Sequence, residues 1–238
     1  TEGSRAFALW LALQSDVAHG HPDEQARKDA EEMLALLTPV VKAFLTDNGF
    51  ASTVLAQQVF GGHGYIREWG MEQYVRDARI NMIYEGTNAI QSLDLLGRKV
   101  LGDSGAKLRK FGKLVAEFVE AEGTNEDMAE FVNPLADLGQ KVEKLTMEIG
   151  MKAFQNPDEA GAAAVDYLRI IGHLVLGYFW ARMAKIALER QDSDDPLYRS
   201  KLATARFYFA KLMPETAALI RSARAGAKPL MDVEVDLF

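Results

Sequence analysis

The chain has 238 residues, of which 48% are hydrophobic and 26% are charged, enough for one large domain or two smaller ones. A formal net charge of -7 argues against nonspecific binding to nucleic acid or to anionic membrane surfaces. The chain contains no cysteine, which excludes disulfides, thiolate metal sites and cysteine nucleophiles and fits a reducing compartment such as the cytoplasm.

Hydrophobic residues at helical spacing dominate the amino-terminal part. Residues 1–18 predict a first helix, and "TEGSRAFALWLAL" lacks the basic region and cleavage site of a signal peptide. We expect the chain to begin inside a helix of a longer protein. Pro22 can start a second helix that runs to about Phe60, with Pro39 and Gly49 as candidate breaks.

A glycine-rich stretch separates these helices from the next two. "GGHGY" predicts a sharp turn. Helices are then predicted over residues 70–84 and 88–101, the second with Leu93, Leu96 and Val100 on one stripe. "GDSG", residues 102–105, is the best candidate for a domain boundary.

The remainder predicts four amphipathic helices. The first two carry stripes that begin at Leu108 and Phe131, and the third and fourth run from about Gly161 to Arg190 and from about Pro196 to Ala225. The apolar third helix is interrupted by charged residues, which argues against a membrane span. We therefore predict an all-α protein of two successive helical bundles, residues 1–102 and residues 103–238.

Glu85 is the first candidate for chemistry. It lies between Tyr84 and Gly86, just beyond a predicted helix end. A carboxylate held among apolar groups has a raised pKa, which suits a general base acting on a weakly acidic proton. Gly86 permits close approach of another molecule to the backbone. The alternative, favoured by spacing alone, is that Thr87 and Asn88 cap the next helix and Glu85 faces water.

Other polar residues give weaker signals. Gln58, Gly61 and Gly62 could approach a ligand's phosphates, but the spacing is not the G-x-G-x-x-G fingerprint, and a helix-ending turn is favoured. The run Arg76-Asp77-Ala78-Arg79 is typical of a surface ion-pair network.

The four histidines do not predict a metal site. His19 and His21 lack further ligands, so none is predicted there. His63 lies in the glycine turn, where a direct role with a ligand is the less favoured reading. His173 is interpreted as a core residue.

Taken together and in order, "AQQVFGGHGY" and "VRDARINMIYEGTNAIQ" resemble the carboxy-terminal signature of the acyl-CoA dehydrogenase family. The resemblance covers about residues 1–101. Residues 103–238 more weakly resemble the extra helical tail of larger, mostly bacterial members, some of which act on methylthio-acyl or long-chain substrates. The implied fold is the family's carboxy-terminal helical bundle followed by a second, four-helix-bundle-like extension.

The resemblance implies a reaction. Family members carry FAD and introduce a double bond between the α and β carbons of an acyl-CoA thioester. The residue at the position of Glu85 removes the α-proton while hydride leaves for the flavin, and its backbone N–H also bonds the thioester oxygen. Such chemistry requires a stabilised enolate and a dry base.

The resemblance also implies roles for neighbouring residues. Those matching Gln58, Gly61 and Gly62 contact FAD held mainly by the neighbouring subunit, and Thr87 matches a residue near the flavin's phosphates. Substrate contacts are implied for Tyr65, Tyr84 and Gly86. Many relatives have glutamine where this chain has Ala89, which removes one side-chain contact to FAD. The implied partners are acyl-CoA, electron-transfer flavoprotein as electron acceptor, and further copies in a homodimer or homotetramer.

Two alternatives remain open at this point. An acyl-CoA oxidase shares the signature but passes electrons to oxygen, and a non-catalytic helical oligomerisation module would use the same helices for assembly. Because a complete family member also has an amino-terminal helical domain and a central β domain, we expect these 238 residues alone to be inactive.

Overall fold

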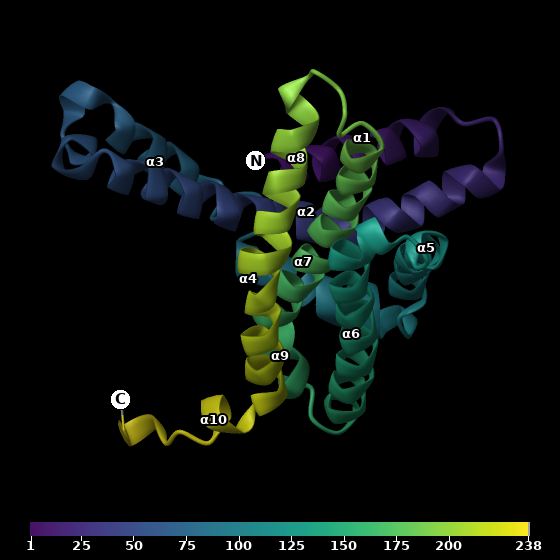
Figure 1. Ribbon diagram of the computed structural model, residues 1–238. Coiled ribbons are helices and arrows are strands. Elements are labelled where there is room, and N and C mark those ends of the chain that lie inside the picture. The colour runs from purple at the N-terminus through teal and green to yellow at the C-terminus, as the bar shows by residue number, and fades with distance from the viewer. Residues whose placement is uncertain (238) are drawn as a thin grey trace.

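The computed structural model describes residues 1–237, which are mostly helical and contain no strand (Figure 1). The all-α prediction is confirmed. The α-helices are α1 (Glu2–Gly20), α2 (Glu24–Val59), α3 (Met71–Ile80), α4 (Asn88–Leu93), α5 (Ala106–Glu122), α6 (Ala129–Gln155), α7 (Asp158–Glu189), α8 (Pro196–Phe207), α9 (Thr216–Ala225) and α10 (Lys228–Met231).

Short 3₁₀ and π segments join these helices. One π segment, Asp94–Val100, continues α4, and another, Tyr208–Leu212, follows α8. The fourth helix predicted for the tail, 196–225, is therefore not one continuous α-helix. It is divided into α8 and α9, and Pro214 lies in a 3₁₀ turn between them.

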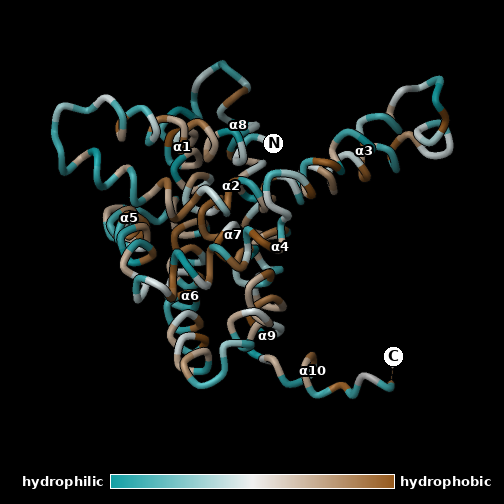
Figure 2. Tube along the Cα trace, turned by 180° about the vertical axis from the view of Figure 1, so that it is seen from behind, coloured by the Kyte–Doolittle hydropathy of each residue, from teal (hydrophilic) through white to brown (hydrophobic). Residues whose placement is uncertain are grey.

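Helix α7 forms the centre of the core. It contacts α1, α2, α4, α6, α8 and α9 and is buried on nearly all sides between Ala163 and Ala187. Phe7 of α1 and Phe44 of α2 are completely or almost completely buried against it, and each such side chain contributes roughly 1.5–3 kcal/mol of hydrophobic stabilisation. Figure 2 shows the apolar stretches gathered where these helices meet.

By length and composition alone, α7 could also cross a membrane. However, 78% of its most apolar 18-residue window is buried inside the molecule, as expected for the central helix of a packed core. This agrees with the expectation that the segment is not a membrane span.

Helix α2 is a single helix of 36 residues, so the candidate breaks at Pro39 and Gly49 are wrong. A proline inside a helix costs about 3 kcal/mol. The burial of Leu36, Leu37 and Val40, each with no exposed surface, offsets that cost around Pro39. The tertiary contacts therefore override the local preference.

The last part of α2 projects from the body and pairs with α3 in a helical hairpin, the arm (residues 50–80), seen in both Figure 1 and Figure 2. The guanidinium of Arg79 lies over the ring of Phe50, 5.8 Å from its centroid. Asp77 accepts a hydrogen bond from Gln73 at 2.6 Å. The ion-pair network expected around Arg76, Asp77 and Arg79 is thus not formed by the described residues.

The proposed boundary at residues 102–105 is a tight turn with Ser104 and Gly105 in the left-handed region, at φ 56° and 77°. The buried side chains on its two sides nevertheless form one continuous cluster, from Phe7 to Ala223. A division into residues 1–102 and 103–238 stays a prediction.

His173, on α7, is a core residue as predicted, with 4% of its surface exposed. Its Nδ1 lies 3.0 Å from the Tyr208 hydroxyl, and its Nε2 lies 3.5 Å from a Glu215 oxygen. Two nitrogens on one edge of the Arg169 guanidinium, Nε and a terminal nitrogen, donate to the two carboxylate oxygens of Glu215. Burial lowers the pKa of His173, and the positive charge of Arg169 acts in the same direction against the attraction of Glu215.

This cluster predicts a loss of stability in acid. Because the pKa of folded His173 is lowered, the unfolded chain takes up a proton near pH 6.5 that the folded chain does not. Stability should therefore be complete above about pH 6.5 and fall as the pH drops below it. Urea unfolding should show this fall between about pH 7.5 and 5.5, and His173→Gln should remove most of it. An equal fall in both proteins would assign the effect to other groups.

A second prediction concerns the contact between α2 and α7. A Cβ atom at Gly172 would overlap the ring of Phe44, so Gly172→Ala should destabilise the chain by about 1–3 kcal/mol. Gly161→Ala, in open space on the same helix, is the matched control and should stabilise by up to about 1 kcal/mol. Denaturant midpoints measure both, and similar values for the two variants would contradict the close approach.

Candidate functional site

The Glu85 turn, residues 84–88, connects the segment after α3 to α4. Glu85 and Gly86 both lie in the left-handed region, at φ 53° and 85°. Such a backbone is uncommon for a residue with a side chain and costs of order 1–3 kcal/mol. Among the non-glycine residues described, only Ser104 shares it. The chain thus holds strain where the candidate base lies.

Several hydrogen bonds hold the backbone of this turn. The Asn88 N–H donates to the Met82 carbonyl at 3.1 Å, and the Gln91 side chain donates to the Glu85 carbonyl at 3.3 Å. The ammonium of Lys42, on α2, donates to the Gly86 carbonyl at 2.7 Å. The positive φ of Gly86, 85°, disfavours any residue with a Cβ atom, and a Cβ atom there would also force the Gln91 amide nitrogen, 2.6 Å away, to move.

Thr87 caps α4 as predicted, since its hydroxyl oxygen accepts from the Ile90 N–H at 3.4 Å. Glu85 itself is exposed, and Tyr84 beside it is 49% exposed. The expectation that this chain keeps the carboxylate away from water is therefore wrong for residues 1–237 taken alone. The turn lies at the outer surface, and within that range no residue covers it.

The other predicted cofactor residues lie at the far end of the arm. Gln58 ends α2, and Gly61, Gly62 and Tyr65 belong to the 3₁₀ turn that follows. All four are exposed, Tyr65 to 80%. A Cβ atom at Gly61 or Gly62 would meet nothing within 4 Å, so the backbone here is open to a large partner.

The predicted site residues therefore form two groups rather than one. Lys42 contacts the Glu85 turn, and Gln58 lies further along the same helix by about 24 Å, at the rise of about 1.5 Å per residue. One group is Tyr84, Glu85, Gly86 and Thr87, at the base of the arm. The other is Gln58, Gly61, Gly62 and Tyr65, at its tip, so Tyr65 does not join the other two predicted substrate residues within one chain.

The arm carries many exposed apolar side chains between the two groups. Val59 is 86% exposed. So many exposed apolar side chains on one projecting hairpin suit association with another protein surface. The set comprises Leu55, Val59, Phe60, Tyr65, Ile66, Trp69, Tyr74 and Ile80.

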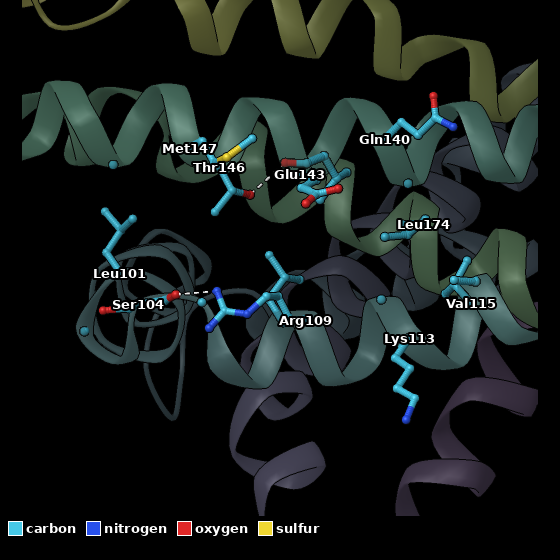
Figure 3. A pocket seen from close by; sticks show the side chains of 18 of the residues that line it. Leu101, Ser104, Arg109, Lys113, Val115, Gln140, Glu143, Thr146, Met147 and Leu174 are labelled. Carbon is cyan, nitrogen blue, oxygen red and sulfur yellow. Dashed lines mark hydrogen bonds between the residues drawn. The ribbon is translucent and has the colours of Figure 1, made fainter.

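A further concave region lies away from both groups of predicted site residues. It is a groove of about 1270 Å³ between α5 and α6, with Val115 and Leu174 in its lining (Figure 3). Arg109 reaches along it to donate to the Ser104 carbonyl. None of the predicted site residues lines this groove. The sequence interpretation, which gave α5 and α6 packing roles only, did not anticipate it.

Two residues that hold the turn were not predicted as functional candidates from the sequence. They are Asn88, at the end of the turn, and Lys42, on α2. Asn88 was considered only as a helix cap, and Lys42 is one of two lysines on α2, the other being Lys28. No local signal could have connected Lys42 with a turn 44 residues later.

The all-α fold, with the Glu85 turn between α3 and α4, agrees with the carboxy-terminal helical bundle that the sequence motifs led us to expect. The chain belongs to the acyl-CoA dehydrogenase family. The family model described as "Acyl-CoA dehydrogenase, C-terminal domain" matches residues 12–101, and the one described as "Acetyl-CoA dehydrogenase C-terminal like" matches residues 111–234. The resemblance stated from the sequence is thus confirmed.

Individual relatives agree. The chain is 35% identical over 223 residues to 3-methylmercaptopropionyl-CoA dehydrogenase of Ruegeria pomeroyi, covering 92% of this chain and 37% of that protein. It is 31% identical over 230 residues to a broad-specificity linear acyl-CoA dehydrogenase of Mycobacterium tuberculosis, covering 90% and 37%. The chain therefore spans little more than a third of the length of these relatives.

The fold also matches a solved structure, that of Caenorhabditis elegans ACDH-11 in complex with C11-CoA. The TM-score is 0.74 at 20% sequence identity, and the match covers 98% of this chain and 38% of the other. At that identity the likeness concerns the fold.

The exposed arm predicts self-association of the isolated chain. Val59→Glu combined with Tyr65→Glu should shift the chain toward monomer at micromolar concentrations, because it places charge in the apolar surface. Leu9→Glu with Leu13→Glu, on the exposed face of α1, is the matched control and should have little effect. Sedimentation velocity measures both. Equal dissociation by the two pairs would show that the arm has no special part.

Proposed function

We propose that this chain is the catalytic-base region of an FAD-dependent acyl-CoA dehydrogenase acting in fatty-acid metabolism. The complete protein catalyses α,β-dehydrogenation of an acyl-CoA thioester, and Glu85 abstracts the α-proton. The single observation that carries the proposal is the strained Glu85 turn. Hydrogen bonds hold its backbone, while the Glu85 carboxylate bonds to none of the described residues.

The backbone of the turn supports a second role. Among the backbone hydrogen bonds of residues 1–237, the Glu85 N–H donates none. A free N–H beside the base is suited to bond the thioester oxygen, on which negative charge develops as the α-proton leaves. Glu85 thus accepts the proton through its side chain and stabilises the enolate through its backbone.

FAD, when bound, supplies the acceptor for the hydride from the β-carbon. The residues present fit a contact to this cofactor rather than a complete site. Gly61, at φ 59°, and Gly62 expose backbone without any enclosing cradle, and Gln58 has a free side-chain amide beside them. The distance along α2 between this tip and Thr87 supports contacts to two different cofactors, one of them held by a neighbouring subunit.

The substrate contacts follow the same division. Tyr84 and Gly86 adjoin the base and would contact the acyl-CoA thioester, whereas Tyr65 would act from the tip in a second copy. We propose a homodimer or homotetramer, with electron-transfer flavoprotein as the electron acceptor and a cytoplasmic location. Because residues outside this chain must cover Glu85 and hold FAD, the 238 residues alone should be inactive.

A second candidate function is non-catalytic assembly. The exposed apolar arm favours it, since such a surface serves association whether or not Glu85 is a base. The two functions differ in what they require of the Glu85 carboxylate.

Glu85→Gln in the complete protein tests this difference. The amide keeps the size of the side chain but cannot accept the α-proton, so kcat should fall by about 10²–10⁴-fold while flavin content and KM change little. Dye reduction under saturating acyl-CoA measures kcat.

Glu31→Gln, at an exposed position on α2, serves as the control and should keep normal turnover. If Glu85→Gln also kept it, the dehydrogenase assignment of this residue would fail and the assembly function would gain.

A further inference from the structure

We propose that Lys42 is the positioning residue of the Glu85 turn. Its ammonium fixes the left-handed backbone from which the base projects, and Asn88 links it to Asp47. The inference rests on the proposed function of Glu85, but the hydrogen bonds that carry it are independent of that function.

Lys42 reaches the turn from the middle of α2. The half-buried side chain donates to the Gly86 carbonyl at 2.7 Å and to the Asn88 side-chain oxygen at 2.8 Å. Both acceptors are neutral, so the contact is not an ordinary ion pair. Hydrogen bonds from a charged donor are roughly twice as strong as those between neutral groups. The lysine therefore binds the turn itself.

Asn88 is oriented for this contact by a carboxylate. Its amide nitrogen donates to Asp47 at 2.6 Å, and it also lies 3.0 Å from the Thr46 hydroxyl. The amide oxygen is thereby turned toward Lys42. The Asn88 amide both accepts from Lys42 and donates to Asp47, so these two bonds polarise each other, and Lys42 donates separately to the Gly86 carbonyl.

The position of Lys42 is not explained by helix stability. Its ammonium lies at the amino-terminal end of α4, next to Asn88, the first residue of that helix. The helix dipole disfavours a cation there. A favourable contact with the turn must outweigh this repulsion, which indicates that holding the Gly86 carbonyl is what the lysine does.

The strained backbone indicates how the turn would change if the contact from Lys42 were removed. With the Gly86 carbonyl released, the peptide after Gly86 can rotate and let Glu85 leave φ 53° for an unstrained conformation. The carboxylate and the free N–H would both move relative to the substrate. Displacement of a reacting group by about 1 Å can reduce a rate by about 10²-fold.

The test uses Lys42→Met and Lys42→Arg in the complete, flavin-loaded protein. Lys42→Met should lower kcat by about 10- to 100-fold with little change in KM or flavin content, and Lys42→Arg should restore most of it. Exchange of the substrate α-proton with D₂O, which reports proton abstraction alone, should slow in parallel. Lys141→Met, at an exposed lysine paired with Asp137 on α6, is the matched control.

A structural measurement separates this inference from the proposed function. Amide hydrogen exchange of peptides covering residues 80–92 should become faster in Lys42→Met and stay normal in Lys141→Met. If Lys42→Met does not fold, Asn88→Ala replaces it and should lower kcat in the same direction by a smaller factor.

The outcomes are distinct. If Glu85→Gln is inactive while Lys42→Met keeps normal kcat, α-proton exchange and amide protection, the positioning role is wrong and the base assignment stands. If Glu85→Gln retains activity, the proposed function fails, and faster amide exchange in Lys42→Met would still show that the lysine holds the turn. If Lys42→Met made amide exchange faster throughout the chain, and Lys42→Arg did not recover kcat, Lys42 would have only a structural role.

Discussion

The close packing of α2 on α7, where Gly172 faces the ring of Phe44, is the constraint on which the rest of the structure depends. This contact fixes the middle of α2 against α7, and α2 continues as one helix of 36 residues through Pro39. That one helix carries Lys42 beside the Glu85 turn and Gln58 at the tip of the arm. The separation of the two groups of site residues is therefore set by a helix length and not by flexible loops.

Sequence patterns predicted most of the fold, because hydrophobic spacing reports directly on helices. The stripes of Phe111 and Leu135 are buried as expected. The tail helices lie close to their predicted positions, although the fourth is divided into α8 and α9. The errors have one cause. Pro39 lies within α2 because burial of its neighbours outweighs the lost hydrogen bond. Similarly, the helix predicted over 70–84 ends at Ile80, where contacts with α2 and α4 draw the chain into a turn that no local propensity specifies.

The candidate site was predictable in composition but not in geometry. The motif around Glu85 names the residue and its neighbours. It does not reveal that Glu85 has a positive φ, that the carboxylate is exposed in residues 1–237, or that Tyr65 lies far from Tyr84. These properties depend on tertiary contacts. The contribution of Lys42 was invisible for the same reason, since its partners are more than forty residues away.

The contacts of Lys42 also separate two requirements of the proposed general base, namely the orientation of its carboxylate and the removal of that carboxylate from water. A carboxylate paired with an ammonium would have a lowered pKa and be a weaker base. Lys42 instead binds the Gly86 carbonyl and the Asn88 amide, which fixes the backbone and leaves the Glu85 carboxylate unpaired among the described residues. On the proposed function, this chain supplies the orientation of the carboxylate, and the surroundings that keep water from it would come from whatever covers the turn. Orientation can be built into one helical region, whereas desolvation requires a second surface.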